Sequence, residues 1–168
     1  VNRMVASGIT GAYFVAVNTD MQDLIASNAD EVIQIGKELT KGLGAGSNPD
    51  VGKAAAEESI EDLRRMLQGT NLLFITTGLG GGTGNGAAPV IARIAKEIGC
   101  VVVGVVTKPF SFEGKKRMIQ ALQGIEEMRP YVDTLITVPN DKLLEIIGTN
   151  TTYQEAFAEA DRVLEQGV

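Results

Sequence analysis

Short runs of apolar residues alternate along the chain with longer stretches in which apolar positions recur at helical spacing. The runs lie at residues 12–18, 31–35, 71–77, 100–107 and 134–138. The strongest of them are continuous rather than alternating, which is typical of strands buried on both faces of a parallel sheet. The pattern therefore predicts a mainly parallel sheet of five strands.

The amphipathic stretches predict the helices that connect these strands. Apolar side chains spaced three or four residues apart share one face of a helix. Four helices are expected: one capped by Asp50 and carrying Ile60, Leu63 and Leu67, one beginning near Pro89, one carrying Met118, Ile119, Leu122 and Ile125, and one beginning at about Thr152. Alternating strands and helices indicate an α/β fold with a doubly wound sheet, and no domain boundary is visible within the chain.

Composition and charge remove several classes of function. The formal net charge is -6 over 168 residues, which argues against a duplex nucleic-acid binder. The sequence contains no His, which excludes Ser-His-Asp and Cys-His nucleophiles, and its single cysteine, Cys100, excludes disulfides and Cys-cluster zinc sites. The longest apolar run, 100–106, is too short to span a bilayer, and the first residues lack a signal-peptide layout. We expect a cytoplasmic protein that does not insert into membranes.

Glycine is concentrated in two places that precede predicted helices. Six of the 20 glycines lie in residues 78–86, the first glycine loop, and a second glycine loop occupies residues 42–49. Glycine allows positive φ and close approach of a ligand, and successive N–H groups at a helix N-terminus bind anions such as phosphate. Thr83 and Asn85 add side-chain donors. Two such loops in one sheet predict a site for a ligand with several phosphates, the alternative being a hinge or tight turns.

The first glycine loop does not fit the two commonest phosphate motifs. It lacks the Gly-Lys-Ser/Thr ending of a P-loop. Gly82, Gly84 and Ala87 match a dinucleotide fingerprint loosely, but the next predicted strand ends at Thr107-Lys108 without the carboxylate that would hold a ribose. A dinucleotide-dependent enzyme is therefore kept only as an alternative.

Seven motifs, in order, resemble the tubulin/FtsZ family of GTPases. The segment from Gly80 to Gly86, GGGTGNG, is similar to the tubulin signature loop, and the others lie at residues 17–20, 42–49, 107–110, 112–114, 138–141 and 156–161. The resemblance covers essentially the whole chain. It implies a Rossmann-like GTP-binding domain of a cell-division protein that assembles head to tail into filaments at the division site, the ring at midcell.

The resemblance also implies a set of nucleotide contacts. Phosphates would be held by Gly80, Gly81, Gly82, Thr83, Gly84 and Asn85, with Gly44, Ala45 and Gly46 over the terminal phosphate and Arg117 on the phosphate side. Asn18 would line the pocket, Thr107 and Pro109 would lie near the sugar, Glu113 would take the ribose hydroxyls, Asn140 and Asp161 would read the guanine edge, and Phe157 would stack on the base.

The spacing of some of these residues agrees with such roles. Glu113 and Arg117 are four residues apart, as are Phe157 and Asp161, so each pair shares one helix face. Three cations, Lys115, Lys116 and Arg117, stand at a predicted helix start, where they oppose the helix dipole. A nearby anionic ligand accounts for Arg117, and a solvated surface accounts for the two lysines. The alternatives are core packing for Phe157 and a solvated helix face for Asp161.

One departure and two expected truncations limit the resemblance. Asn85 stands where the family usually has Thr or Ser, so a hydroxyl is replaced by an amide that can still donate. Residues 1–168 are expected to be a GTP-binding domain cut at both ends, with a first strand before Val1 and the activating carboxylates after Val168. We expect GTP or GDP with Mg²⁺ carried on the nucleotide, self-association and other division proteins as partners, and no nucleic acid. The alternative is a nucleotide-binding or capping module that does not hydrolyse GTP.

Overall fold

All five predicted strands form and all pair in parallel. The computed structural model describes residues 1–148 and 150–168. The strands are β1 (Val15–Asn18), β2 (Glu31–Gln34), β3 (Leu72–Gly78), β4 (Val101–Lys108) and β5 (Thr134–Pro139). They form two hydrogen-bonded groups, β1-β2 and β3-β4-β5, rather than the single sheet expected, because β1 and β3 are not bonded to each other. Apolar side chains of both groups nevertheless join one core.

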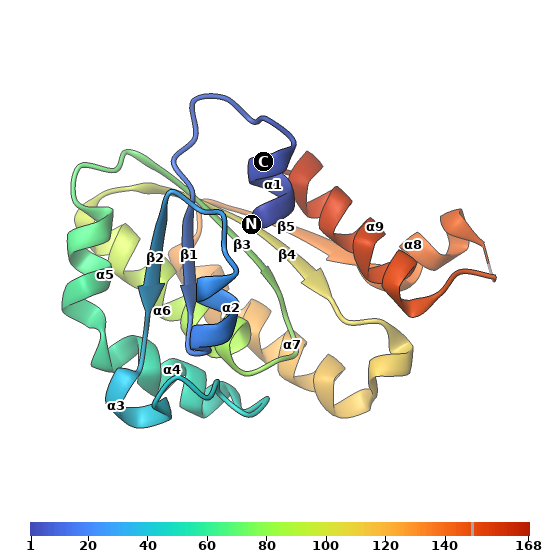
Figure 1. Cartoon of the computed structure of the whole chain (residues 1–168), viewed down its shortest axis with the longest axis horizontal. Coiled ribbons are helices and arrows are strands. Elements are labelled where there is room, and N and C mark those ends of the chain that lie inside the picture. Colours follow the sequence, from blue (N-terminus) through green and yellow to red (C-terminus); the bar gives the residue numbers. More distant parts are fainter. Residues whose placement is uncertain (149) are drawn as a thin grey trace.

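Helices connect the strands and flank them (Figure 1). The helices are α1 (Asn2–Ala6), α2 (Met21–Ile25), α3 (Lys37–Thr40), α4 (Pro49–Glu58), α5 (Ile60–Leu67), α6 (Thr83–Ile98), α7 (Lys115–Met128), α8 (Asn140–Ile147) and α9 (Tyr153–Gln166), with 3₁₀ turns η1 (Ser111–Glu113) and η2 (Arg129–Tyr131). Among the described residues, no helix is both long and apolar enough to cross a membrane.

Strand β4 shows that the sheet is covered on both faces. Val102 and Val106 belong to the large core beneath α4, α5, α6 and α7. The alternate residues Val103 and Val105 point the other way and pack with Met4 of α1 and Leu164 of α9. Successive side chains of a strand point to opposite faces, so β4 separates two helical layers. The doubly wound arrangement is confirmed.

The predicted helix capped by Asp50 differs from the observed one in two ways. Asn48 is the N-cap of α4, its side chain accepting a hydrogen bond from the backbone N–H of Asp50 (3.0 Å), and Pro49 occupies the first helical position. Asn is among the preferred N-cap residues, and Asp50 cannot be the cap because it already lies inside the helix. Proline is favoured at the first helical position, where the N–H that it lacks would have no partner within the helix. The predicted helix is also divided at Ser59, whose hydroxyl accepts a hydrogen bond from Gly36 N–H (3.0 Å).

Helix α6 begins earlier than expected, at Thr83 rather than near Pro89. The end of the first glycine loop is therefore the first turn of α6. Pro89 lies inside the helix. Most residues of α6 are buried, and those next to Pro89 include Gly86, Ala87 and Ala88. A proline in a sequence usually indicates a position near the start of a helix, but Pro89 lies in the second turn of α6.

The inward face of α7 is also not the one expected. Ile119 and Leu122 are 58% and 47% exposed, whereas Ala121, Gly124, Ile125 and Met128 are the buried residues. The small side chains of Ala121 and Gly124 allow α7 to lie close to the neighbouring helix. The predicted apolar stripe was thus correct at Ile125 and wrong at Ile119 and Leu122.

Candidate functional site

The predicted site residues gather at one edge of the fold, where the parallel strands end. Asn18 is the last residue of β1, Thr107 lies at the end of β4, and Asn140 directly follows β5. The first glycine loop follows β3 at the same edge. Ligands of open α/β sheets bind outside the carboxyl ends of the strands, so this edge is the expected place for a ligand.

The first glycine loop presents a row of backbone donors at the start of α6. Gly80 has φ +100°, a conformation that favours glycine, and an added Cβ at Gly81 would meet nothing within 4 Å. Within the described part of the chain, the backbone N–H groups of residues 81–84 have no hydrogen-bond partner. Unpaired N–H groups at a helix N-terminus attract anions through hydrogen bonds and the helix dipole. The geometry can therefore accept a phosphate.

Other glycines of this loop allow close packing, Gly84 against the end of β3 and Gly86 against α4. A Cβ at Gly84 would lie 2.1 Å from Thr77 Oγ1, and a Cβ at Gly86 would lie 2.0 Å from the carbonyl oxygen of Pro49. A Cβ at Gly52, in α4, would lie 2.3 Å from the carbonyl oxygen of Gly82. Helices α4 and α6 thus cross at backbone contact distance. The loop combines an open anchor for an anion with a tight helix crossing, and both account for its glycine content.

The second glycine loop lies against the first. A Cβ at Gly82 would be 2.8 Å from Ala45 Cβ and 2.9 Å from the backbone nitrogen of Asn48. Thr83 Oγ1 lies 2.6 Å from Thr19 Oγ1, and Thr19 is fully buried. Close packing therefore brings the two predicted phosphate loops together, and the hydroxyl pair ties the first loop to the turn after β1. Thr19 was not predicted as a site residue, because its partner is 64 residues away and no local pattern links them.

Asn18 organises the turn between β1 and α2, which lies against the second glycine loop through hydrogen bonds such as that from Met21 N–H to the Gly42 carbonyl oxygen (3.1 Å). Its side-chain oxygen accepts hydrogen bonds from Thr19 N–H (2.8 Å) and Asp20 N–H (3.3 Å), and its amide donates to Asp23 (3.1 Å). Gly44, with φ +81°, lies beside Asp20, whereas an added Cβ at Gly46 would meet nothing within 4 Å. The side chain of Asn18 therefore fixes the shape of this turn, and the space beside Gly46 is open.

The residues expected near sugar and phosphate form a second side of the same site. Pro109 and the backbone of Arg117 enclose Gly80, because a Cβ there would come within 3.2 Å of Pro109 Cγ and 2.8 Å of the Arg117 carbonyl oxygen. Arg117 Nη1 pairs with Glu113 Oε1 at 2.8 Å, as their spacing predicts. Glu113 also accepts a hydrogen bond from Phe110 N–H (2.8 Å). Thr107 is buried, and its carbonyl oxygen accepts a hydrogen bond from Leu79 N–H (2.9 Å).

Asn85 does not take the position expected for a phosphate donor. Its side chain is buried, with Oδ1 accepting a hydrogen bond from Gly80 N–H (2.9 Å) and Nδ2 donating to the carbonyl oxygen of Gln120 (2.9 Å). The carboxamide therefore lies between the loop and α7. The sequence could indicate a donor at this position but not its direction, because Asn85 lies in the first turn of α6 rather than in an open loop.

The residues expected at the base include an exposed aromatic group. Phe157 makes an edge contact with Phe110 (centroids 5.4 Å) and another with Phe112 (6.1 Å), and Tyr153 tilts against Phe112 (4.7 Å). Phe110 is fully buried, whereas Phe112 and Phe157 are each 43% exposed. We call these four side chains the aromatic cluster. The alternative given for Phe157, a role in core packing, therefore applies only in part, because its ring packs on the buried Phe110 but is itself 43% exposed.

The two polar residues expected at the base differ in their surroundings. Asn140 is buried, and its Oδ1 has no hydrogen-bond partner in the described structure. A buried polar atom without a partner is unusual, and one explanation is a missing ligand. Asp161 is largely exposed and lies 3.9 Å from Arg3 Nε, while Arg3 also donates to the Ala158 carbonyl oxygen (3.0 Å). Arg3 was not considered from the sequence.

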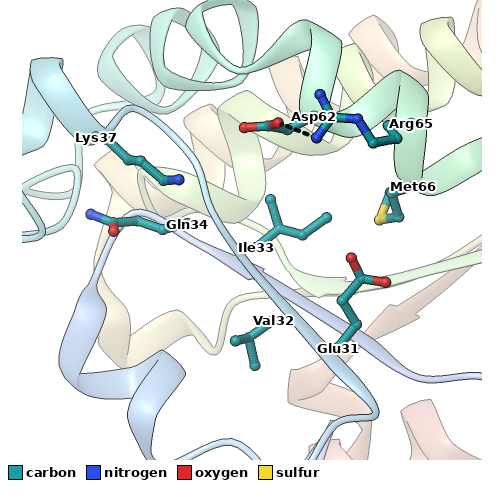
Figure 2. Close-up of a pocket in the computed structure, with 8 residues that line it drawn as sticks. All are labelled: Glu31, Val32, Ile33, Gln34, Lys37, Asp62, Arg65 and Met66. Carbon is teal, nitrogen blue, oxygen red and sulfur yellow. Dashed lines mark hydrogen bonds and ion pairs between the residues drawn. The ribbon is translucent and has the colours of Figure 1, made fainter.

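Two hollows lie apart from these loops. Figure 2 shows a groove of about 290 Å³ along β2 and α5, lined by Glu31, Val32, Ile33, Gln34, Lys37, Asp62, Arg65 and Met66. Asp62 and Arg65 pair across its upper wall at 3.3 Å, and none of the predicted site residues lines it. A cleft of about 480 Å³ adjoins α9 and includes Arg3, Glu155 and Arg162. Among the described residues, no group of three or more His, Cys, Asp or Glu could hold a metal ion.

The fold described above is also found in known proteins. The sequence profile described as "Tubulin/FtsZ family, GTPase domain" matches residues 2–148. The structure is similar to an FtsZ dimer of M. jannaschii (51% identity, TM-score 0.95, 98% of this chain and 48% of that one). It is also similar to the W319Y mutant of M. jannaschii FtsZ (50%, 0.96, 99% and 50%) and to GDP-bound CetZ1 from Haloferax volcanii (30%, 0.83, 98% and 52%). The chain spans about half the length of these relatives.

Proposed function

Since the chain belongs to the tubulin/FtsZ family through its GTPase domain, we propose that it binds GTP and GDP at the carboxyl ends of its strands. The phosphates would lie on the N–H groups of residues 81–84. The observation that carries the proposal is this row of four consecutive donors without partners in the described chain, at the start of a buried helix. Backbone donors can hold phosphate in a chain of net charge -6 without a basic cluster.

The other contacts follow from the positions around this row. Gly80 and Asn85 shape the loop, Gly44, Ala45 and Gly46 would cover the terminal phosphate, and Arg117 would neutralise phosphate charge. Thr107, Pro109 and Glu113 would face the sugar, with Asn18 at the pocket edge. Asn140 would accept or donate at the guanine edge, the Asp161 carboxylate would accept there, and Phe157 would stack on the base. The unpartnered Oδ1 of buried Asn140 supports the base position, because a guanine donor would satisfy it.

The residues present fit Mg²⁺ only as an ion carried on the nucleotide. The described part of the chain holds no cluster of three metal-ligating side chains, so phosphate oxygens and water would supply most ligands. When bound, the ion would supply charge neutralisation to the phosphates. The chain's own contribution is to hold the phosphates by backbone N–H groups and to orient them with the second glycine loop.

Hydrolysis and assembly are proposed for the whole protein. Attack of water on a γ-phosphate requires positioning and electrostatic stabilisation rather than a covalent nucleophile, which is compatible with a chain without His. We place the activating carboxylates on a neighbouring subunit, so that GTP hydrolysis is tied to head-to-tail filaments. The M. jannaschii relative described as an FtsZ dimer supports self-association. The cellular role would be cell division and septation, in the cytoplasm at the midcell ring, together with other division proteins.

Competition binding tests the nucleotide proposal. A fluorescent GDP analogue bound to the chain should be displaced by GTP and GDP at much lower concentrations than by ATP or NAD. Preferential displacement by NAD would overturn the proposal in favour of a dinucleotide enzyme.

A turnover assay addresses the alternative of a binding or capping module. Phosphate release from GTP should be negligible for the isolated chain at concentrations where it is monomeric. Appreciable turnover by the monomer would contradict a catalytic site that needs a second subunit.

A further inference from the structure

We propose that Asn85 is a positioning residue that holds the first glycine loop in its phosphate-accepting shape by tying it to α7. The proposal rests on the proposed nucleotide site and deepens it. Asn85 itself would touch no phosphate. It would act through the turn at Gly80, which precedes the free N–H groups of residues 81–84.

The hydrogen bonds of Asn85 join three segments. Its Oδ1 accepts from Gly80 N–H at 2.9 Å, and its Nδ2 donates to the Gln120 carbonyl oxygen at 2.9 Å. Asn85 is 4% exposed, so water does not replace these partners easily. One carboxamide thus fixes the beginning of the loop, the first turn of α6 and the middle of α7 relative to one another. A buried polar group satisfied on both sides specifies a single arrangement.

The direction of the Gly80 amide explains why the tie matters. Gly80 has φ +100° and turns its N–H inward to Asn85, while the following N–H groups have no partner in the described chain. If Gly80 were released, its N–H would be free to point elsewhere and the turn would lose its fixed conformation. Donors that already have the right positions bind an anion without a loss of conformational entropy, whereas mobile donors must first be ordered at a cost in binding free energy.

The same tie sets the place of Arg117. Gln120, which accepts from Asn85, is one helical turn beyond Arg117 on α7. The Arg117 carbonyl oxygen would lie 2.8 Å from a Cβ at Gly80, so the two backbones already touch. The backbone that carries Arg117 and the loop that carries the row of N–H groups are therefore held together. Asn85 would align a cation and a donor row on one phosphate group.

Gly124 is the structural complement of Asn85. A Cβ at Gly124 would lie 2.8 Å from Asn85 Oδ1 and 2.9 Å from its Cγ and Nδ2. Gly124 lies inside α7, where alanine is the more favourable helix residue. The glycine leaves the volume that the carboxamide occupies. The two residues should therefore behave as a coupled pair rather than as independent sites.

The test compares a ligand with phosphates to the same ligand without them. GDP and guanosine are titrated against the chain and against Asn85→Ala by NMR. Loss of the tie should weaken GDP binding about tenfold, since a buried hydrogen-bond partner is removed, and should change guanosine binding less than about twofold. An equal decrease for both ligands, or no decrease for GDP, would overturn the proposal. If the unaltered chain binds neither ligand, the proposed nucleotide site itself is wrong.

A control separates positioning from general stability. Asp133→Ala removes a comparable tie, between Asp133 Oδ2 and Val102 N–H (2.8 Å), at the opposite end of the strands. It should lower stability without changing the ratio of GDP to guanosine affinity. A changed ratio in this control would show that the ratio reports stability and would overturn the interpretation.

Coupling with Gly124 gives an independent readout that does not need a ligand. Hydrogen exchange at Gly80 N–H should be slow in the unaltered chain and fast in both Asn85→Ala and Gly124→Ala. Gly124→Ala should destabilise the unaltered chain more than it destabilises Asn85→Ala, where the carboxamide no longer occupies the space. Additive effects, or unchanged exchange at Gly80 in both single variants, would contradict the proposal.

Discussion

The phosphate side and the base side of the proposed site are built in different ways. The phosphate side consists of backbone held by buried contacts, such as Gly82 against Ala45 and Thr83 against fully buried Thr19. The base side consists of side chains, and apart from the buried Asn140 they are open to solvent, with Phe157 43% exposed and Asp161 largely exposed. Helix packing therefore sets the phosphate side before any ligand arrives, whereas the base side presents surfaces that a ligand would cover.

This difference predicts where substitutions act. Changes at Gly82 and Gly84 should alter folding and phosphate affinity together, because these two glycines pack closely against neighbouring segments and also carry free N–H donors. Changes on the base side should alter ligand choice with little effect on folding. The comparison fails if a base-side variant is as destabilising as a phosphate-side one.

The largest effect is expected at the crossing of α4 and α6. Gly86→Ala would place a Cβ 2.0 Å from the Pro49 carbonyl oxygen and 2.5 Å from the Lys53 nitrogen, both of them backbone atoms that cannot rotate away. We expect a loss of about 3 kcal/mol in the free energy of unfolding, measured by urea denaturation. Gly81→Ala is the matched control, because nothing lies within 4 Å of its Cβ. Equal stability of the two variants would contradict the tight crossing.

The next effect is expected at the aromatic cluster. Phe157→Ala removes the ring proposed to stack on the base and should weaken binding of GDP and ADP alike, by about tenfold, because stacking does not depend on base identity. The comparison is with Tyr153→Ala, which also removes a ring of the aromatic cluster but not the proposed stacking one. Fluorescence competition measures both. Equal losses of nucleotide affinity in the two variants would show that the effect comes from disturbing the aromatic cluster and not from loss of stacking on the base.

An effect of similar size, but confined to the choice between bases, is expected at Asp161. The carboxylate of Asp161 is proposed to accept hydrogen bonds from N–H groups that guanine has and adenine lacks. Asp161→Ala should therefore lower the preference for GTP over ATP about tenfold. ATP affinity should change little, and the melting temperature should stay close to that of the unaltered chain because Asp161 is exposed. Unchanged selectivity would show that Asp161 does not read the base.

The smallest effect is expected at the start of α9. The backbone N–H and the hydroxyl of Thr152 donate to Glu155 and lower the pKa of this carboxyl below its ordinary value of 4.5. A lowered pKa in the folded state adds stability above pH 4.5 that is lost as the pH falls through the folded value. Glu155→Gln should reduce the melting temperature slightly at pH 7, and the difference should shrink as the pH falls below 4.5. A difference that is the same at all pH values would exclude the charge as its cause.

Strands and phosphate loops could be predicted from the sequence because their signals are local. Short apolar runs located all five strands, and glycine clusters located both loops. Local signals failed where the deciding partner is distant in sequence. Nothing near Asn85 shows that its carboxamide contacts Gln120, 35 residues away. Nor does the sequence show that Gly52 packs on Gly82, or that Ala121 and Gly124, rather than Ile119 and Leu122, face the core.

The central claim, that backbone donors of the first glycine loop hold the phosphates, is tested most directly by a GDP titration followed by amide NMR. At 17.8 kDa the chain suits this measurement. The amide signals of Gly81, Gly82, Thr83 and Gly84 should move furthest and saturate together, because a phosphate would accept hydrogen bonds from these groups. Saturating shifts confined to the groove along β2 and α5, with the glycine amides unmoved, would contradict the account.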